Sequence, residues 1–145
     1  MGNLYDYYAA TDDAQAIARS EGDAGLADPF GTIGLKGVMP DGILGTVESC
    51  LTGVPEEQVE ACPRFCELLN EDDQDGPWLV SLTDTLRDAL AQATPDRLLE
   101  AATAWTRTED GAGQSPELMA DFLKRLGELA RDAGPQRRLY CRMSL

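Results

Sequence analysis

A chain of 145 residues with a formal net charge of −14 argues against nucleic-acid binding, because phosphates require a basic protein surface. The same charge disfavours an anionic membrane surface, and no apolar run reaches the roughly 18–20 residues that span a bilayer. With 43% hydrophobic and 26% charged residues, the composition predicts one globular domain over residues 1–145.

The N-terminal half of the chain predicts two strands and two helices. Residues 4–9 are rich in aromatic side chains, which favour a strand, and they alternate Tyr5 and Tyr7 with Asp6 and Tyr8. The next elements in chain order are a short helix over 11–19, a strand over 32–38, a helix over 40–53, and broken helical turns over 55–69.

An acidic segment follows, which we expect to be an exposed loop and a candidate interaction site. Its carboxylates are Glu71, Asp72, Asp73 and Asp75. After it, the pattern predicts a short strand over 78–82 and two helices, which begin after the capping residues Thr83 and Thr94.

The last 31 residues predict a long amphipathic helix and a closing strand. Ser115 and Pro116 suit a helix start, and Gly134 and Pro135 suit its end. The expected apolar stripe comprises Leu118, Met119, Phe122, Leu123, Leu126, Leu129 and Ala133. The period then changes to two over residues 138–145, as in a half-buried strand. We therefore predict an α+β fold, mostly helical, with a small sheet that includes the N- and C-terminal strands.

The chain contains no histidine, which excludes Ser-His and Cys-His nucleophiles and imidazole zinc sites. A zinc site built from the four cysteines would need Cys50, Cys62, Cys66 and Cys141 together, but the C-x-x-C spacing is missing. No phosphate-loop or dinucleotide motif is present either. We expect no metal and no cofactor.

An aromatic and arginine patch is the best candidate binding surface. If the terminal strands pair, we expect Tyr5 or Tyr7 to lie near Tyr140, with Arg138 and Arg142 beside them. The candidate binding residues at these strands are Asp6, Tyr8, Arg138, Tyr140 and Arg142. The alternative is that helices cover this face and its aromatic side chains are buried.

Several short motifs resemble the YfbM-like family of small bacterial proteins, whose function is not established. They are Met1-Gly2 before the strand Tyr5–Tyr8, Leu51-Thr52-Gly53, Leu82-Thr83, Phe122, Leu123 and Leu126, and Leu139-Tyr140-Cys141. Relatives can carry a Trp-x-x-Leu-His pattern where this chain has Leu44, Val47 and Glu48. The composition is similar to actinobacterial proteins. The resemblance implies one compact α+β domain and supplies no catalytic residues.

The N-terminus lacks the basic and apolar regions of a signal peptide, and Asp6 stands where myristoylation requires Ser or Thr. We therefore expect a cytoplasmic protein with reduced thiols. Our first hypothesis is a non-enzymatic, acidic interaction or ligand-binding domain, and one version of it is an immunity-type inhibitor of a basic toxin or nuclease. The alternative is a small enzyme that uses carboxylate, tyrosine and arginine chemistry in a cleft.

Overall fold

The computed structural model describes residues 4–21, 32–70 and 77–144, and its four strands form one antiparallel sheet. The strands are β1 (Leu4–Ala10), β2 (Ile33–Lys36), β3 (Trp78–Ser81) and β4 (Arg138–Ser144), in the order β2-β1-β4-β3. The two terminal strands lie side by side in the middle of the sheet, with Leu4 opposite Ser144 and Ala10 opposite Arg138. The predicted α+β fold, with both terminal strands in one small sheet, is confirmed.

Helices occupy most of the remaining described chain. They are α1 (Asp13–Glu21), α2 (Pro40–Thr52), α3 (Glu56–Glu60), α4 (Asp84–Gln92), α5 (Pro95–Thr106) and α6 (Pro116–Ala133). The side chains of Thr83, Thr94 and Ser115 each accept a hydrogen bond from the backbone N–H three residues later, as predicted for N-caps. The short helix α3 lies within residues 55–69, for which the sequence predicted only broken helical turns.

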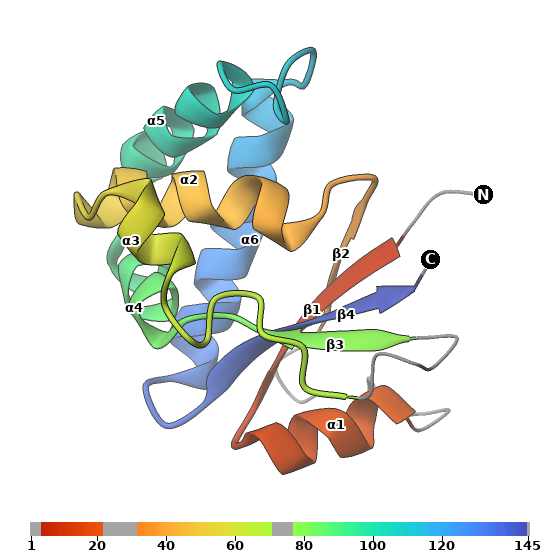
Figure 1. Cartoon of the computed structure of the whole chain (residues 1–145). Helices are drawn as coiled ribbons and strands as arrows, with labels where there is room; N and C mark the ends of the chain where they lie inside the picture. Colours follow the sequence, from red (N-terminus) through yellow and green to blue (C-terminus); the bar gives the residue numbers. More distant parts are fainter. Residues whose placement is uncertain (1–3, 22–31, 71–76, 145) are drawn as a thin grey trace.

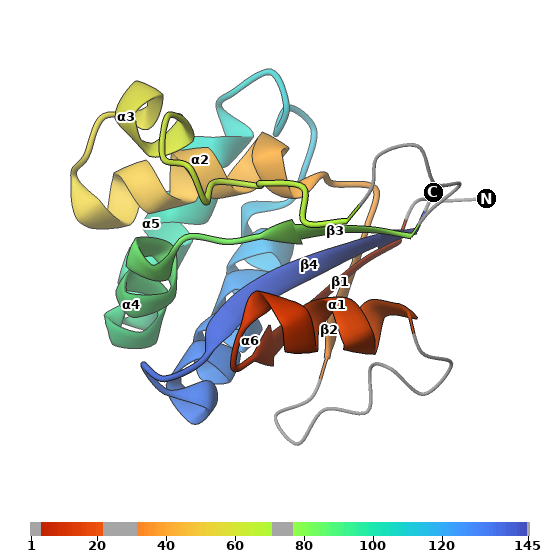
Figure 2. The same ribbon diagram turned by 60° about the horizontal axis from the view of Figure 1, so that its bottom comes forward.

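The sheet carries a thick helical layer, α2 to α6, on one face and the single helix α1 on the other (Figures 1 and 2). The alternation along β1 explains this division. Tyr5, Tyr7 and Ala9 are buried in the large core beneath the helical layer. The ring of Tyr7 packs against Phe122 of α6, with ring centroids 5.1 Å apart.

The second face of the sheet forms a smaller core with α1. Tyr8, Leu79 and Tyr140 are fully buried there together with Ala16 of α1. The hydroxyl of Tyr8 donates a 2.7 Å hydrogen bond to the carbonyl of Ala16, which holds the helix against the sheet. This face is therefore closed by α1 and does not form an open aromatic surface.

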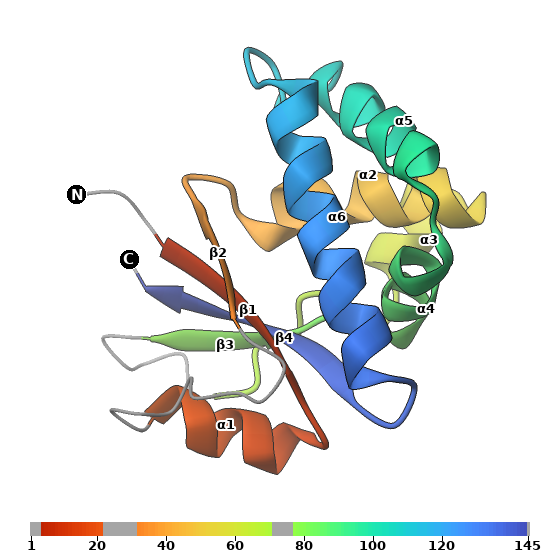
Figure 3. The same cartoon turned by 180° about the vertical axis from the view of Figure 1, so that it is seen from behind.

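One detail of the predicted apolar stripe of α6 is wrong. Met119, Phe122 and Leu126 are buried as expected, but Leu118 is 68% exposed. The first turn of α6 lies beside α5, beyond the end of the sheet (Figure 3), and Leu118 is on the solvent side of this turn. Within the described ranges, none of the helices combines the length and the apolar composition needed to cross a membrane.

Candidate functional site

The five predicted patch residues lie on the sheet face that α1 covers. Tyr8 is opposite Tyr140 and Asp6 is opposite Arg142 in the pairing of β1 with β4. The expectation that Tyr5 or Tyr7 lies near Tyr140 is wrong, because this register turns both of them into the large core on the other face. Arg138 is opposite Ala10 at the other end of this pairing. The strand register therefore brings these side chains onto one face, and their contacts decide whether a ligand could reach them.

Tyr140 belongs to a hydrogen-bonded group with Asp13 and Arg64. Its hydroxyl donates to Oδ1 of Asp13 at 2.7 Å, and Arg64 donates to both carboxylate oxygens, at 3.0 and 3.1 Å. The bonds from Arg64 lower the pKa of Asp13. Burial, followed by the bond to the Asp13 carboxylate, raises the pKa of Tyr140 well above its usual value. Tyr140 is consequently a stable donor at neutral pH.

The arginines of the patch are also used within the chain. Arg142 donates from Nε to the carbonyl of Ser20 at 3.2 Å, and its Nη1 lies 4.0 Å from Oδ2 of Asp6. Burial raises the pKa of Asp6, and the charge of Arg142 partly opposes this shift. Arg138 lies 3.5 Å from a carboxylate oxygen of Asp84. The charged side chains of the patch therefore already have partners within this chain.

Asp13 makes a testable contribution to acid stability. The pKa of Asp13 is lower in the folded state than in the unfolded chain, where it is about 3.9. Its contribution to the free energy of unfolding is therefore complete above about pH 3.9 and is lost as the pH falls through the folded-state pKa. We expect Asp13→Asn to lower the free energy of unfolding at pH 7 and to have a smaller effect near pH 3. Urea unfolding at both pH values measures this. Asp132→Asn, at an exposed position, is the control, and an equal effect of Asp13→Asn at both pH values contradicts the assignment.

Two other predicted features are the acidic segment before β3 and the four cysteines. The acidic segment Glu71, Asp72, Asp73 and Asp75 lies outside the described residues.

All four cysteines are free thiols, and the described residues contain no group of three or more Cys, Asp or Glu side chains arranged to hold a metal ion. Burial raises the pKa of the Cys66 thiol to about 12, with added contributions from the carboxylates of Asp41 and Glu60. This thiol is therefore a poor nucleophile.

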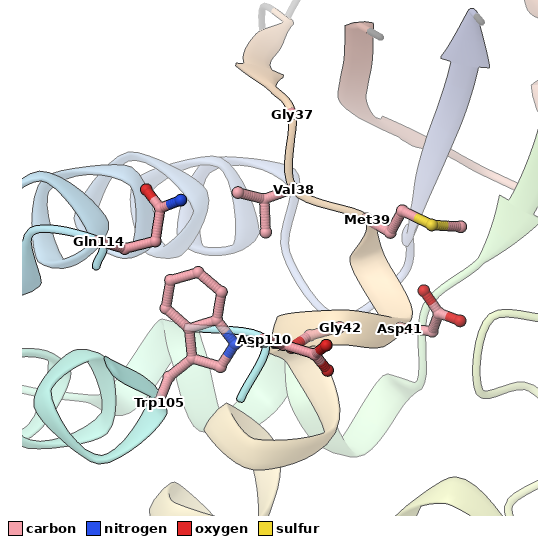
Figure 4. A pocket seen from close by; sticks show the side chains of 8 residues that line it. All are labelled: Gly37, Val38, Met39, Asp41, Gly42, Trp105, Asp110 and Gln114. Atoms are coloured by element: carbon pink, nitrogen blue, oxygen red, sulfur yellow. Dashed lines mark hydrogen bonds between the residues drawn. The ribbon is translucent and has the colours of Figure 1, made fainter. Parts of the chain in front are cut away.

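A concave site lies at the start of α2, which Figure 4 shows in close view. We call it the acidic pocket. It has a volume of about 310 Å³, at the lower end of the roughly 300–1,000 Å³ of ligand pockets. Its lining residues are Gly37, Val38, Met39, Asp41, Gly42, Trp105, Asp110 and Gln114.

Packing of α5 against α2 builds this pocket. The buried indole of Trp105 donates from Nε1 to the carbonyl of Gly42 at 2.6 Å. A side chain at Gly42 would begin 3.8 Å from Oδ2 of Asp110, so the Asp110 carboxylate lies beside the first turn of α2. The positive end of the helix dipole favours carboxylates at this position, and both Asp41 and Asp110 line the pocket there.

The chemistry of the pocket suits binding. The exposed carboxylates of Asp41 and Asp110 and the amide oxygen of Gln114 can accept hydrogen bonds from an ammonium or guanidinium group, beside the buried indole of Trp105. The eight lining residues include no hydroxyl, thiol or imidazole that could act as a nucleophile. None of the three other hollows that we find is lined by Asp6, Tyr8, Arg138, Tyr140 or Arg142.

Sequence reasoning did not find this pocket. In the sequence Asp41 stands at a helix start, Trp105 has the spacing of an apolar helix face, and Asp110 and Gln114 lie between two helices. These local patterns do not indicate a pocket, because it depends on contacts between segments about 60 residues apart.

Comparison with known proteins gives no further guidance. A scan against protein families, a search of curated proteins and a search of solved structures each returned no match. The resemblance to the YfbM-like proteins therefore stays a prediction.

Proposed function

We propose that this chain is a non-enzymatic interaction domain that binds a basic protein through the carboxylates of its helical layer. The observation that carries the proposal is the division of charge. Most of the arginines contact acceptors of the same chain, whereas many of the carboxylates face the solvent with no partner among the described residues.

The cations of the chain are largely engaged internally. All twelve lysines and arginines lie in the described part of the chain. Nine of them contact acceptors of the same chain: Arg19, Arg64, Arg87, Arg97, Arg125, Arg131, Arg137, Arg138 and Arg142. These contacts leave few cations to screen the carboxylates from a partner.

The carboxylates have the opposite arrangement. Nine of them are exposed and make no side-chain hydrogen bond or ion pair with the described residues. They are Asp41, Glu57, Glu60, Glu67, Asp96, Glu109, Asp110, Glu128 and Asp132. Eight of them lie in or shortly after helices of the helical layer, Glu67 lies beside β3, and two of the eight line the acidic pocket. An unpaired anionic surface of this kind attracts a basic partner.

Electrostatic attraction acts mainly on the rate of association. Complementary charges can raise association rate constants from about 10⁵–10⁶ M⁻¹s⁻¹ to 10⁸–10⁹ M⁻¹s⁻¹ at low salt. An inhibitor that must reach a toxin or nuclease before its substrate does benefits most from such speed. We therefore favour the immunity-type version, in which the partner is a basic toxin or nuclease and both proteins meet in the cytoplasm.

A small enzyme is the second candidate, and the group formed by Asp13, Arg64 and Tyr140 favours it. Carboxylate, guanidinium and phenol groups occur together in sites that bind anions or transfer protons. In this chain they bond to one another. Screening of the purified chain against several substrate classes tests this candidate. An enzymatic activity that the wild type shows and Tyr140→Phe lacks would support the enzyme over the interaction domain.

The first candidate is tested by affinity capture from native lysate of the source cells. The whole chain serves as bait beside a variant in which Glu57, Glu60 and Glu109 become Gln and Asp110 becomes Asn. We call it the four-carboxylate variant, and Leu118→Ala is the uncharged control. We expect the wild type and the control to retain one stoichiometric basic protein, and the variant to retain much less. The proposal fails if no stoichiometric basic partner appears.

A further inference from the structure

An apolar groove runs between α5 and α6, the two helices that lie side by side in Figures 1 and 3. We call it the α5–α6 groove. Its volume is about 340 Å³, and its apolar lining is formed by Pro95, Leu98, Leu99 and Ala120. Leu98 is buried at 3% exposure and forms the floor, whereas Leu99 is 42% exposed at the edge. Water therefore contacts a leucine that a partner side chain could cover.

We propose that this groove is the docking site for an amphipathic helix of the basic partner, with one apolar side chain in the groove and lysines or arginines at its acidic edges. The inference rests on the proposed function and names the surface and the partner element. Helix-in-groove recognition uses apolar anchors spaced three or four residues apart, and this spacing leaves the flanking positions free for charges.

Charge complementarity identifies the occupant. The groove is edged by Asp96, Glu117 and Asp121 against the single cation Lys124. Arg125 forms an exposed ion pair with Asp121, at 3.3 Å, and this pair is worth little in water. A cationic helix gains from the remaining negative charge over the whole length of the groove.

The same charges exclude a second copy of this chain as the occupant. Each copy carries a net charge of −14 and would bring the same acidic edges to the contact. Like charges placed opposite one another across an interface suppress association. We therefore expect the chain alone to show no self-association through this groove.

Two synthetic peptides of about 18 residues test the proposal, since this length gives five helical turns. One peptide carries leucines three or four residues apart with lysines at the other positions, which gives an amphipathic helix. The other peptide replaces each leucine by alanine, which keeps the charge and the helix propensity. Both are titrated into the ¹⁵N-labelled whole chain. We expect the leucine peptide to bind more tightly and to shift the amide signals of Leu99 and Ala120 more than those of other helices.

Two leucine variants separate docking from general charge attraction. Leu99→Ala should weaken binding of the leucine peptide by about three- to tenfold, because it removes the exposed edge of the groove. Leu118→Ala is the matched control, because Leu118 is exposed on α6 outside the groove lining and should leave the affinity unchanged.

The outcomes distinguish the two proposals. Equal binding of both peptides, with no effect of Leu99→Ala, overturns the groove and leaves the acidic interaction domain standing. Signals that shift only at the acidic pocket have the same meaning. If neither peptide binds at low salt, the groove proposal is overturned. If the lysate also yields no basic partner, the proposed function fails with it.

Discussion

Thr83→Val should lower the free energy of unfolding by about 2–4 kcal/mol, although valine has nearly the shape of threonine. The Thr83 hydroxyl accepts from the backbone N–H of Leu86 at 3.1 Å, which caps α4. It also donates to the carboxylate of Glu48, which is only 4% exposed. Loss of a cap costs about 1 kcal/mol. Loss of a bond to a charged, buried acceptor costs about 1.5–3 kcal/mol more.

Urea unfolding of the purified variants measures this effect, with Thr83→Ser as the control. Serine keeps both hydrogen bonds, so its cost should stay near that of one lost methyl group, about 1 kcal/mol. In a Glu48→Ala background, Thr83→Val should cost only the cap, because the carboxylate is no longer present. A cost of Thr83→Val below about 1 kcal/mol in the wild-type background contradicts this account of the buried carboxylate.

Trp105→Ala should be the most damaging single substitution, with a loss of about 3–5 kcal/mol. The ring is fully buried between α2 and α5, and its N–H holds the first turn of α2 through Gly42. Natural domains are stable by only about 5–15 kcal/mol, so this variant could be partly unfolded at 25 °C. Circular dichroism during denaturant unfolding reports both the stability and the residual structure.

Trp105→Phe separates packing from hydrogen bonding. It keeps most of the apolar ring and removes only the N–H donor, so we expect a loss of about 1–2 kcal/mol. The variant should fold but lose the alignment of α2 that forms the acidic pocket. If Trp105→Ala costs less than Trp105→Phe is expected to cost, the indole does not have the central packing role that its burial indicates.

The fold was predictable where its signals are local. The alternation of Tyr5, Asp6, Tyr7 and Tyr8 predicted the two faces of β1, and the same period predicted β4. Capping residues placed the starts of α4, α5 and α6 correctly. Leu118 shows the limit of periodicity, because spacing identifies one face of a helix but not how far the rest of the fold extends along it.

The candidate site was much less predictable. The strand alternation separated Asp6 and Tyr8 from Tyr5 and Tyr7, but only the register of β1 against β4 shows that Tyr8 is the one opposite Tyr140. The contacts that occupy the patch residues come from elsewhere in the chain. Asp13 and Arg64 are 51 residues apart, and nothing in their local sequence pairs them. The buried carboxylate of Glu48 is bonded to Thr83, 35 residues away. Such pairs are set by tertiary packing, which one sequence does not encode in any short pattern.

Attraction of the partner by the exposed carboxylates should appear in the association rate constant of the captured partner as a function of ionic strength. The wild type and the four-carboxylate variant are compared by stopped flow between about 0.02 M and 0.5 M salt, over which the screening length falls severalfold. We predict that the wild-type rate constant falls at least about tenfold over this range and that the variant starts lower and falls less. Identical salt dependence of the two proteins would contradict the proposal that the exposed carboxylates attract the partner.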